Sequence, residues 1–401
     1  MDLPTMQARF AVIADEMFTG NNGEPVVAVG VLVDEGIIVD VDAAATIRRR
    51  AKLADADLYE VESPTTLIPG LIDGHVHLGW RGGIDGERQS AASMQAAAGQ
   101  VLASGVTTVR DCGSPGYDLL RLRDEINAGL FPGPRIIACG PALTTTGGHG
   151  EFIGLTADSK DQLRRRVQEL AAAGVDAIKV MATGGAMDSH TNRRRAQYSV
   201  DELAELVDVA HRLGLPVVAH CNATEGIENA VTAGVDTIAH CNWLGTEEGT
   251  IDYRPALADA ILRQGISIDL NIEATLAPLS AGDGHAQIWD GRAPANRWEL
   301  HLELRRRGAA ILLTSDEFAG GIARFPHLLA AAVRTAGIPT AEVIYRATSV
   351  PAEVLRIADQ VGTIASGKTA DLVLLKGLLS SDAGAITRIV KVWQAGRPID
   401  L

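Results

Sequence analysis

Two histidines that stand two residues apart, His75 and His77, suggest metal chemistry at the end of an apolar stretch. The stretch, LIPGLIDGHVHL at residues 67 to 78, is predicted to form a single strand. Side chains alternate between the two faces of a strand, so both imidazoles point the same way. Two neighbouring imidazoles supply half of a metal site. So short a motif also fits a turn residue followed by a hydrogen-bonded core histidine, and the rest of the chain has to provide further ligands.

Lys179 is the second unusual residue, because it stands between Ile178 and Val180 in the apolar segment AIKVMATGG. A lone ammonium group within a buried strand is costly unless it is paired. Burial favours the neutral form of an amine, and a neutral amine can react with carbon dioxide to give a carbamate that bridges two cations. The alternative is a lysine that extends to the strand end and pairs with Asp316. Beside the histidines of the chain, the bridging role is favoured.

Three more candidate ligands end apolar segments of the same kind. His220 ends VVAHC, His240 ends DTIAHC, and Asp316 ends ILLTSD. Singly, each histidine is explained by a backbone hydrogen bond in the core, and Asp316 by a helix N-cap. Six polar groups at the ends of five predicted strands favour a metal site instead. The remaining candidates are predicted on helices or loops without a metal role: His211, His285, His301 and His327.

The elements that position these residues follow one rhythm of strand, loop and helix from residue 67 to residue 316. Eight strands are predicted, each followed by a helix, and most are continuous apolar runs, as strands covered on both faces require. The pattern predicts an α/β fold, a (β/α)8 TIM-like barrel, with its chemistry at the carboxyl ends of the strands. A doubly wound open sheet is the alternative architecture.

Both ends of the chain have a different sequence pattern. Residues 8–66 and the tail contain short alternating strands broken by Gly, Asn and Asp, which suits a small β-sandwich. We predict one discontinuous β-sandwich domain, residues 1–66 and 356–401, around a barrel of residues 67–355. The tail also holds GTIASGKT at 362–369, which matches the phosphate-loop pattern. Because a strand rather than a helix is predicted after it, we interpret it as a turn.

Bulk composition narrows the choice of partners. The chain of 401 residues has a net charge of −14, so a phosphate backbone would be repelled and nucleic-acid binding is not expected. No membrane span and no signal peptide are evident. The four cysteines are scattered, which suggests reduced thiols in a cytoplasmic protein. We expect a small-molecule substrate and a homo-oligomer.

Taken together, the motifs resemble the amidohydrolase superfamily over essentially the full length of the chain. The matching stretches are PGLIDGHVHL, GVTTVRDCG, GVDAIKVMATGG, GLPVVAHC, GVDTIAH, LLTSD and GTIASGKTADLVLL. The segment MATGG with the loop to RAQYS, and the segment TTTGGHG, are similar to the prolidase-like branch, which contains Xaa-Pro dipeptidases and related metal-dependent carboxypeptidases.

The resemblance implies a centre of two divalent metal ions, usually zinc, which lowers the pKa of water and polarises the scissile carbonyl. Its ligands would divide between a more buried ion (His75, His77, Asp316) and a second ion (His220, His240), bridged by a carboxylated Lys179 and a hydroxide. Asp316 would take the proton of the attacking hydroxide and pass it to the leaving amine. His149 in TTTGGHG would contact the substrate carbonyl, or else is a solvated histidine in a glycine-rich loop.

The sequence departs from this branch at positions expected to line the substrate pocket. Trp243 replaces a tyrosine that commonly follows the strand-six histidine by three residues, and Asn222 stands where the branch often has another histidine. Glu317 follows Asp316 where small residues are usual. Arg193, in the loop after strand four, is a candidate carboxylate ligand, although a solvated loop arginine needs no such role. The indole in place of a phenol favours a larger or more apolar substrate.

We therefore expect a metal-dependent hydrolase of a C–N bond, for example the amide of an N-acyl amino acid or a dipeptide-like compound. A cyclic-amide or carbamate hydrolase with the same centre is the alternative. A mononuclear deaminase is less favoured, because that chemistry does not need Lys179. A non-catalytic barrel scaffold is less favoured, because none of the six ligands is missing.

Overall fold

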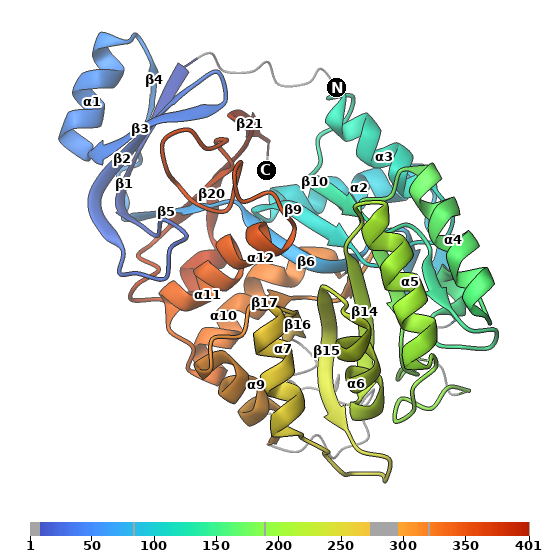
Figure 1. Cartoon of the computed structure of the whole chain (residues 1–401). Helices are drawn as coiled ribbons and strands as arrows, with labels where there is room; N and C mark the ends of the chain where they lie inside the picture. The colour runs from blue at the N-terminus through green and yellow to red at the C-terminus, as the bar shows by residue number, and fades with distance from the viewer. Residues whose placement is uncertain (1–8, 83–84, 188–189, 273–295, 320, 401) are drawn as a thin grey trace.

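The computed structural model describes residues 9–82, 85–187, 190–272, 296–319 and 321–400. It has a mixed α/β fold in which strands and helices alternate along the central part of the chain (Figure 1). The central strands are parallel, and a separate sheet joins the two ends of the chain.

Parallel strands form two sheets in the centre of the molecule. The first has the order β10 (Arg135–Ala138), β9 (Val106–Asp111), β6 (Leu71–His77) and β18 (Glu317–Phe318). The second has the order β12 (Gly154–Thr156), β11 (Ala142–Thr144), β13 (Ile178–Met181), β14 (Val217–Ala223), β15 (Thr237–Leu244), β16 (Ser267–Asn271) and β17 (Ile311–Thr314). All eight expected strands are present: β6, β9, β10, β13, β14, β15, β16 and β17. The strands β7 (Trp80–Arg81) and β8 (Glu87–Arg88) form an antiparallel pair.

Two junctions bring these sheets together. The strands β10 and β11 are successive segments separated only by residues 139–141, so the chain passes from one sheet directly into the other. At the opposite edge, β17 leads through Ser315 and Asp316 into β18, and β17 itself packs beside β6. The strand ends that carry the candidate ligands therefore belong to adjoining sheets.

Helices cover the outer side of the parallel strands, as Figure 1 shows for α4 to α7. In chain order they are α2 (Ala91–Ala103), α3 (Asp118–Asn127), α4 (Lys160–Ala173), α5 (Val200–Arg212), α6 (Thr224–Ala233), α7 (Pro255–Gln264), α9 (Asn296–Arg306), α10 (Phe325–Ala336), α11 (Thr340–Arg346) and α12 (Ser349–Val354), with 3₁₀ turns at Glu151–Ile153, Ile322–Arg324 and Ala383–Thr387. A capping box between Ser199 and Glu202 begins α5. Left-handed glycines end α4, α6 and α7. The largest apolar core lies between these helices and the strands.

Strands from the two ends of the chain pair in a sheet of eight strands. Its order is β21 (Arg397–Ile399), β20 (Ile389–Gln394), β19 (Leu372–Lys376), β5 (Thr65–Pro69), β1 (Arg9–Met17), β2 (Val26–Asp34) and β3 (Ile37–Ala43), with β4 (Asp57–Tyr59) beside β1. The helix α1 (Ala44–Leu53) packs against β1 and β2. The expected pairing of the two terminal segments is thus observed, whereas a two-layer sandwich stays a prediction.

The stretch 67–78 forms two strands, so the prediction of a single strand there is wrong. β5 pairs with β19 in the terminal sheet, and β6 pairs with β9 in the parallel sheet. The break lies at Gly70, whose N–H donates to the carbonyl of Asp371. A Cβ at Gly70 would lie 2.1 Å from Oγ1 of Thr107, so only glycine lets the chain pass between the sheets here. The expected domain boundary after residue 66 falls inside β5.

The segment 362–369 with the phosphate-loop pattern is a turn. It leads into the strand β19, and no helix begins there among the residues that the structure describes. Lys368 donates through Nζ to the backbone carbonyl of Asp359 at 3.1 Å. The interpretation as a turn is therefore confirmed, because a phosphate loop requires a helix N-terminus.

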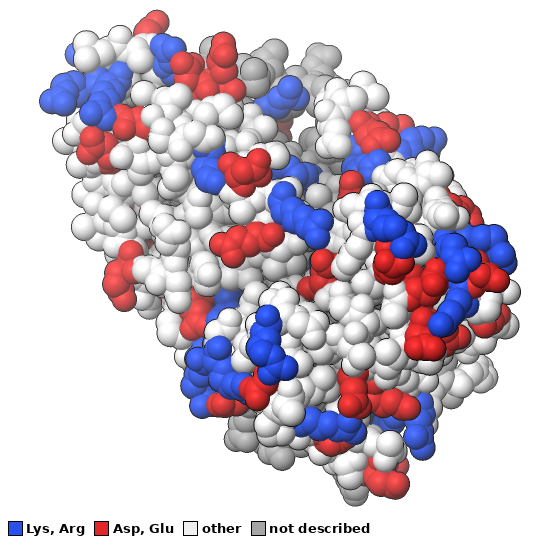
Figure 2. Space-filling view, in the orientation of Figure 1, with Lys and Arg blue, Asp and Glu red and all other residues white. Residues whose placement is uncertain are grey.

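Acidic and basic side chains are interspersed over the face of the molecule shown in Figure 2. Many acidic and basic side chains of the protein form ion pairs, such as Arg164 with Glu205 at 2.8 Å and Arg254 with Glu228 at 2.6 Å. The described residues on the face of Figure 2 therefore form no broad basic surface of the kind that binds nucleic acids. In the described ranges, none of the helices is both long enough and apolar enough to cross a membrane.

Candidate metal centre

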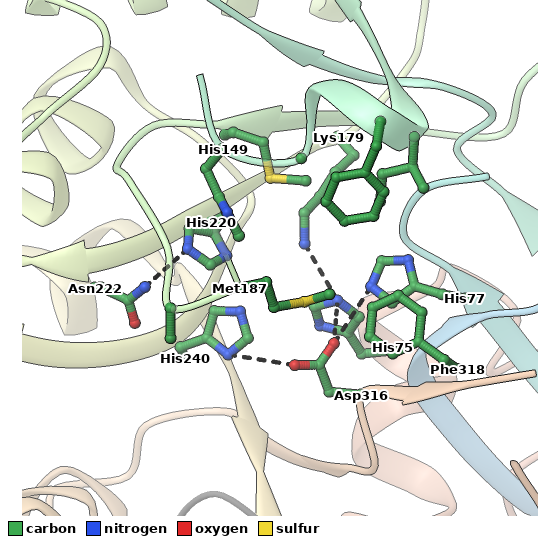
Figure 3. A pocket seen from close by; sticks show the side chains of 15 residues that line it. His75, His77, His149, Lys179, Met187, His220, Asn222, His240, Asp316 and Phe318 are labelled. Atoms are coloured by element: carbon green, nitrogen blue, oxygen red, sulfur yellow. Dashed lines mark hydrogen bonds and ion pairs between the residues drawn. The ribbon is translucent and has the colours of Figure 1, made fainter. Parts of the chain in front are cut away.

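The six candidate ligands converge on one pocket at the carboxyl ends of the parallel strands (Figure 3). They come from β6, β13, β14, β15 and the turn after β17: His75, His77, Lys179, His220, His240 and Asp316. His149, from the loop after β11, lines the same pocket. The ligand atoms of His75, His77 and Asp316 all lie within 4.8 Å of one another. The backbone N–H of Ser315 donates to Oδ1 of Asp73 at 3.1 Å, which ties β6 to the turn after β17 across 242 positions of sequence.

His75 is held from behind by a buried carboxylate. Its Nδ1 lies 2.7 Å from Oδ2 of Asp269, and this contact leaves Nε2 for the pocket. That Nε2 lies 3.2 Å from Oδ1 of Asp316 and 3.3 Å from Nζ of Lys179. Burial favours the neutral ring, but the charge of Asp269 outweighs it and raises the pKa of His75 to about 9. The site therefore favours a cation at Nε2, whether a proton or a metal ion.

His77 presents its Nε2 to the same carboxylate oxygen. Its Nδ1 donates to the carbonyl of Gly113 at 2.8 Å, which fixes the tautomer with a lone pair on Nε2. That Nε2 lies 3.3 Å from Oδ1 of Asp316. The ring of Phe318 stacks on the imidazole, with centroids 4.7 Å apart and planes inclined by 17°. Stacking on one side and a hydrogen bond behind hold this ligand in one orientation.

The imidazoles of His75 and His77 both face the carboxylate of Asp316. Oδ2 of Asp316 accepts a hydrogen bond from Nδ2 of Asn271 at 2.9 Å, and its N–H donates to the carbonyl of His75. Burial opposes its charge, but the imidazoles of His75 and His77 hold its pKa well below its usual range. The backbone at Asp316 is left-handed, with φ of 57°, a strained conformation for a residue with a side chain.

His220 and His240 form the second half of the cluster. Their ring centroids are 4.5 Å apart, and the ring of His149 lies 4.6 Å from that of His220. Burial lowers the pKa of His240 to about 3 and holds that of His220 well below its usual range. Both rings are therefore neutral, the form that binds a metal ion. His240 also has a left-handed backbone, with φ of 66°.

An amide network adjoins His220. Nδ2 of Asn222 lies 2.9 Å from Nε2 of His220 and also donates to the carbonyl of Gly184. Oδ1 of Asn222 in turn accepts from Nδ2 of Asn242 at 2.6 Å. Of the four predicted substrate contacts, Asn222 is the one that lines the described part of the pocket.

Trp243, Glu317 and Arg193 lie away from the described pocket wall. The indole of Trp243 is fully buried and packs edge-on against Tyr253, with ring centroids 4.9 Å apart. Glu317 is buried and pairs with Arg324 at 3.3 Å. Arg193 is half-buried in the loop after β13. The pocket geometry gives no support to a substrate contact for these three, whereas Phe318, next to Glu317, does line the pocket.

Sequence reasoning missed the residues that support the ligands. Asp269 is completely buried on β16; its Oδ1 accepts from Oγ1 of Thr314 at 2.6 Å, and Nη2 of Arg110 lies 3.5 Å from its Oδ2. Asn271, two residues further, supports Asp316. The signal was available, because an aspartate inside the apolar strand SIDLN is as unusual as Lys179 in its own strand.

The donor set fits divalent transition metals. Two imidazole Nε2 atoms are oriented by second hydrogen bonds on Nδ1 and face one carboxylate oxygen, which is the arrangement that supports metal ligands. Imidazole with carboxylate suits zinc, as well as iron, cobalt, nickel or manganese. Lys179 is 1% exposed, so its Nζ lies in the same water-poor space as the ligands.

Solved structures with a similar fold include proteins named as a prolidase and a dipeptidase. A putative prolidase from Bifidobacterium longum has a TM-score of 0.80 and 27% identity, covering 98% of this chain and 95% of that one. A Xaa-Pro dipeptidase with bound methionine has a TM-score of 0.81 at 24% identity, covering 98% and 100%. The latter likeness concerns the fold alone.

The family itself follows from the sequence comparison. The chain belongs to the amidohydrolase family, whose model matches residues 66–401. Ochratoxinase from Aspergillus niger is 26% identical over 98% of this chain and 87% of that protein, and its crystal structure has a TM-score of 0.81. The resemblance to prolidase-like amidohydrolases is thereby confirmed, and the chain is a hydrolase by family.

Proposed function

We propose that this protein hydrolyses an amide C–N bond with two divalent metal ions, of which zinc is the first candidate. The observation that carries the proposal is the convergence of Nε2 of His75 and Nε2 of His77 on Oδ1 of Asp316, beside Lys179. The neutral imidazoles of His220 and His240 would hold a second ion. Relatives named as prolidases and an ochratoxinase support the amide as the bond that is cleaved.

We also propose that the two parallel sheets close into the expected TIM-like barrel. The direct passage from β10 into β11, and the continuation of β17 into β18 beside β6, support closure. In a barrel the carboxyl ends of all strands surround one mouth, where the chemistry of such folds is located. The position of the six ligands agrees with this arrangement.

The residues of this chain have distinct parts in the reaction. Bound metal ions lower the pKa of water and polarise the substrate carbonyl. Asp316 is a carboxylate at neutral pH, so it accepts a proton from the attacking water and delivers it to the nitrogen of the leaving amine. His149 faces the pocket beside His220 and positions the carbonyl oxygen of the substrate.

Lys179 would bridge the two ions after carboxylation. In that step the amine nitrogen forms a bond to the carbon of carbon dioxide, and one proton is released to solvent. A carboxylated Lys179 would supply carboxylate oxygens beside the imidazoles of the four histidines that would hold the ions, namely His75, His77, His220 and His240. The burial of Lys179 and its distance of 3.3 Å to a ligand nitrogen support this role.

Metal analysis combined with a substrate panel tests the proposal. The panel contains N-acyl amino acids, dipeptides, lactams and carbamates, so that a cyclic-amide or carbamate hydrolase would be recognised as well. We expect two ions per chain and activity on linear amides; turnover of none of the classes would refute the amidase function. Replacing Lys179 with alanine should remove two-ion loading, while the matched surface variant Lys160→Ala should not. Full activity with two ions in Lys179→Ala would contradict the bridge.

The cellular location, the partner and the oligomeric state of the enzyme are also proposals. The four cysteines are buried and free, which supports a reducing, cytoplasmic environment. A small-molecule amide is the expected partner, and light scattering of the purified protein would test the expected homo-oligomer.

A further inference from the structure

A small apolar cluster stands beside the metal centre, apart from the main core. Its buried members are Trp80, Ala142, Ile153 and Met181, and Phe152 and Phe318 pack against them. Four of the six also line the pocket: Phe152, Ile153, Met181 and Phe318. We call these four the apolar wall. These four residues lie outside the main apolar core, so we expect the role of their apolar side chains to lie in the pocket.

The two aromatic rings of the wall are held but incompletely buried. Phe318 stacks on the ligand His77 at 4.7 Å, and Phe152 leans on Trp80 with centroids 5.0 Å apart and planes at 45°. Both phenylalanines remain half-buried, so part of each ring faces the pocket. Apolar surface left in water costs about 25 cal/mol for each Å² that a ligand could cover. A substrate group that covers these rings is therefore favoured over one that does not.

Polar groups of the described pocket lie on the metal side. Apart from the six ligands and His149, Asn222 is the polar side chain among the described lining residues. Met187 and Met181 also line the pocket, and thioethers adapt to the shape of a ligand. The pocket thus combines the candidate metal ligands with apolar side chains around a space of about 580 Å³ that includes its open mouth.

We propose that the substrate carries an aromatic or bulky apolar substituent next to its scissile amide, and that Phe318 and Phe152 select it. This inference rests on the amide hydrolysis proposed above and names the class of amide. The position of Phe318 on His77 sets that substituent close to the reacting carbonyl. The apolar wall would supply the selectivity for an apolar substrate, and the role that the sequence suggested for Trp243, whose indole packs against Tyr253, stays a prediction.

Matched substrate pairs test the wall. N-benzoyl-alanine against N-acetyl-alanine varies the acyl side, and N-acetyl-phenylalanine against N-acetyl-alanine varies the amine side. We expect kcat/KM of the aromatic member to exceed that of the small one by about tenfold or more in one pair. Phe318→Ala and Phe152→Ala should each reduce this ratio by about tenfold. The surface variant Phe131→Ala should leave it unchanged, since Phe131 is 36% exposed and is not among the described residues that line the pocket.

A binding measurement separates this inference from the proposed function. Calorimetric titration of benzamide and of acetamide into the metal-free protein needs no turnover, and we expect tighter binding of benzamide that Phe318→Ala weakens severalfold. Metal content is measured for each variant, because Phe318 touches His77. Equal kcat/KM values within both pairs, or a preference that survives both alanine variants, would overturn the wall while leaving amide hydrolysis intact. Benzamide binding without hydrolysis of any amide would overturn the proposed function instead.

Discussion

Replacing Asp269 with asparagine tests whether the metal centre depends on a carboxylate behind His75. The asparagine has the same shape, and its oxygen can still accept from Nδ1 of His75, 2.7 Å away. Its NH₂ group can donate to the hydroxyl of Thr314, which now donates to Asp269 at 2.6 Å. The change therefore removes the negative charge and keeps the packing of a residue that is completely buried.

The size of the effect follows from the electrostatics of His75. Its pKa of about 9 lies above the ordinary 6.5 by 9 − 6.5 = 2.5, and at 1.36 kcal/mol for each pKa unit this favours a cation on the ring by about 3 kcal/mol. The charge of Asp269 is the main cause that raises it. Removing that charge should weaken metal binding about 10- to 100-fold, or about 1.4 to 2.8 kcal/mol.

Competition between the protein and a chromophoric chelator measures the metal affinity directly. Because Arg110 lies 3.5 Å from Asp269 and would lose its partner, urea unfolding of the metal-free variant has to be measured as well. Thr314→Val is the matched control, since it removes one hydrogen bond to Asp269 but keeps the charge. It should lower stability by about 1 kcal/mol and change metal affinity less than threefold. Unchanged affinity in Asp269→Asn would refute the supporting role of this carboxylate.

Three further changes test the site and the fold. Asp316→Asn should reduce kcat at least about 100-fold, because an amide cannot carry the proton to the leaving amine, and stopped or continuous amide hydrolysis assays would measure it. Tyr198→Phe removes a hydrogen bond to the carbonyl of Ala157 and should cost about 1 kcal/mol in urea unfolding at pH 8. Burial raises the pKa of Tyr198, so the stability that its protonated hydroxyl contributes is complete below about pH 10 and is lost as the pH rises. Above about pH 10 the free energy of unfolding of Tyr198→Phe should therefore fall less steeply with pH than that of the unsubstituted protein. Identical slopes would contradict this expectation. Ser199→Ala breaks the capping box with Glu202 and should lower the free energy of unfolding by about 1 kcal/mol without changing metal content, which thermal denaturation and metal analysis would check.

The convergence of the candidate ligands on one pocket could be predicted, because charged and imidazole side chains are conspicuous inside apolar strands. Lys179 and the pair His75 and His77 broke an otherwise continuous apolar pattern, and the strand rhythm placed them at one end of the fold. Asp269 broke the same pattern but was missed, since it acts through His75 and offers no ligand of its own to the pocket. A supporting residue breaks the apolar pattern just as a ligand does, but the pattern alone does not tell the two roles apart.

The other side chains that line the pocket could not be predicted in the same way, because the backbone departs from extended geometry just after the candidate ligands. His240, Cys241 and Trp243 have φ of 66°, 50° and 53°, and Asp316 has φ of 57°. Side chains alternate between the two faces only in extended backbone. The position of Trp243 relative to His240, or of Glu317 relative to Asp316, therefore does not tell which side of the strand its side chain faces. Gly70 is a similar case, since the change of sheet depends on contact with Thr107 from a later strand.

The order of the terminal sheet has a consequence for synthesis on the ribosome. The strand β5 precedes the first metal ligands, yet its antiparallel partner β19 is made only near the end of the chain. Thr66 accepts a hydrogen bond from the N–H of Leu379, 313 residues later. At about 5–20 residues per second, an emerging chain carries this apolar segment without its partner for about 15–60 s. Production of the active protein should therefore respond to slower translation or to added chaperones, which shield an unpaired strand edge until the last strands are released.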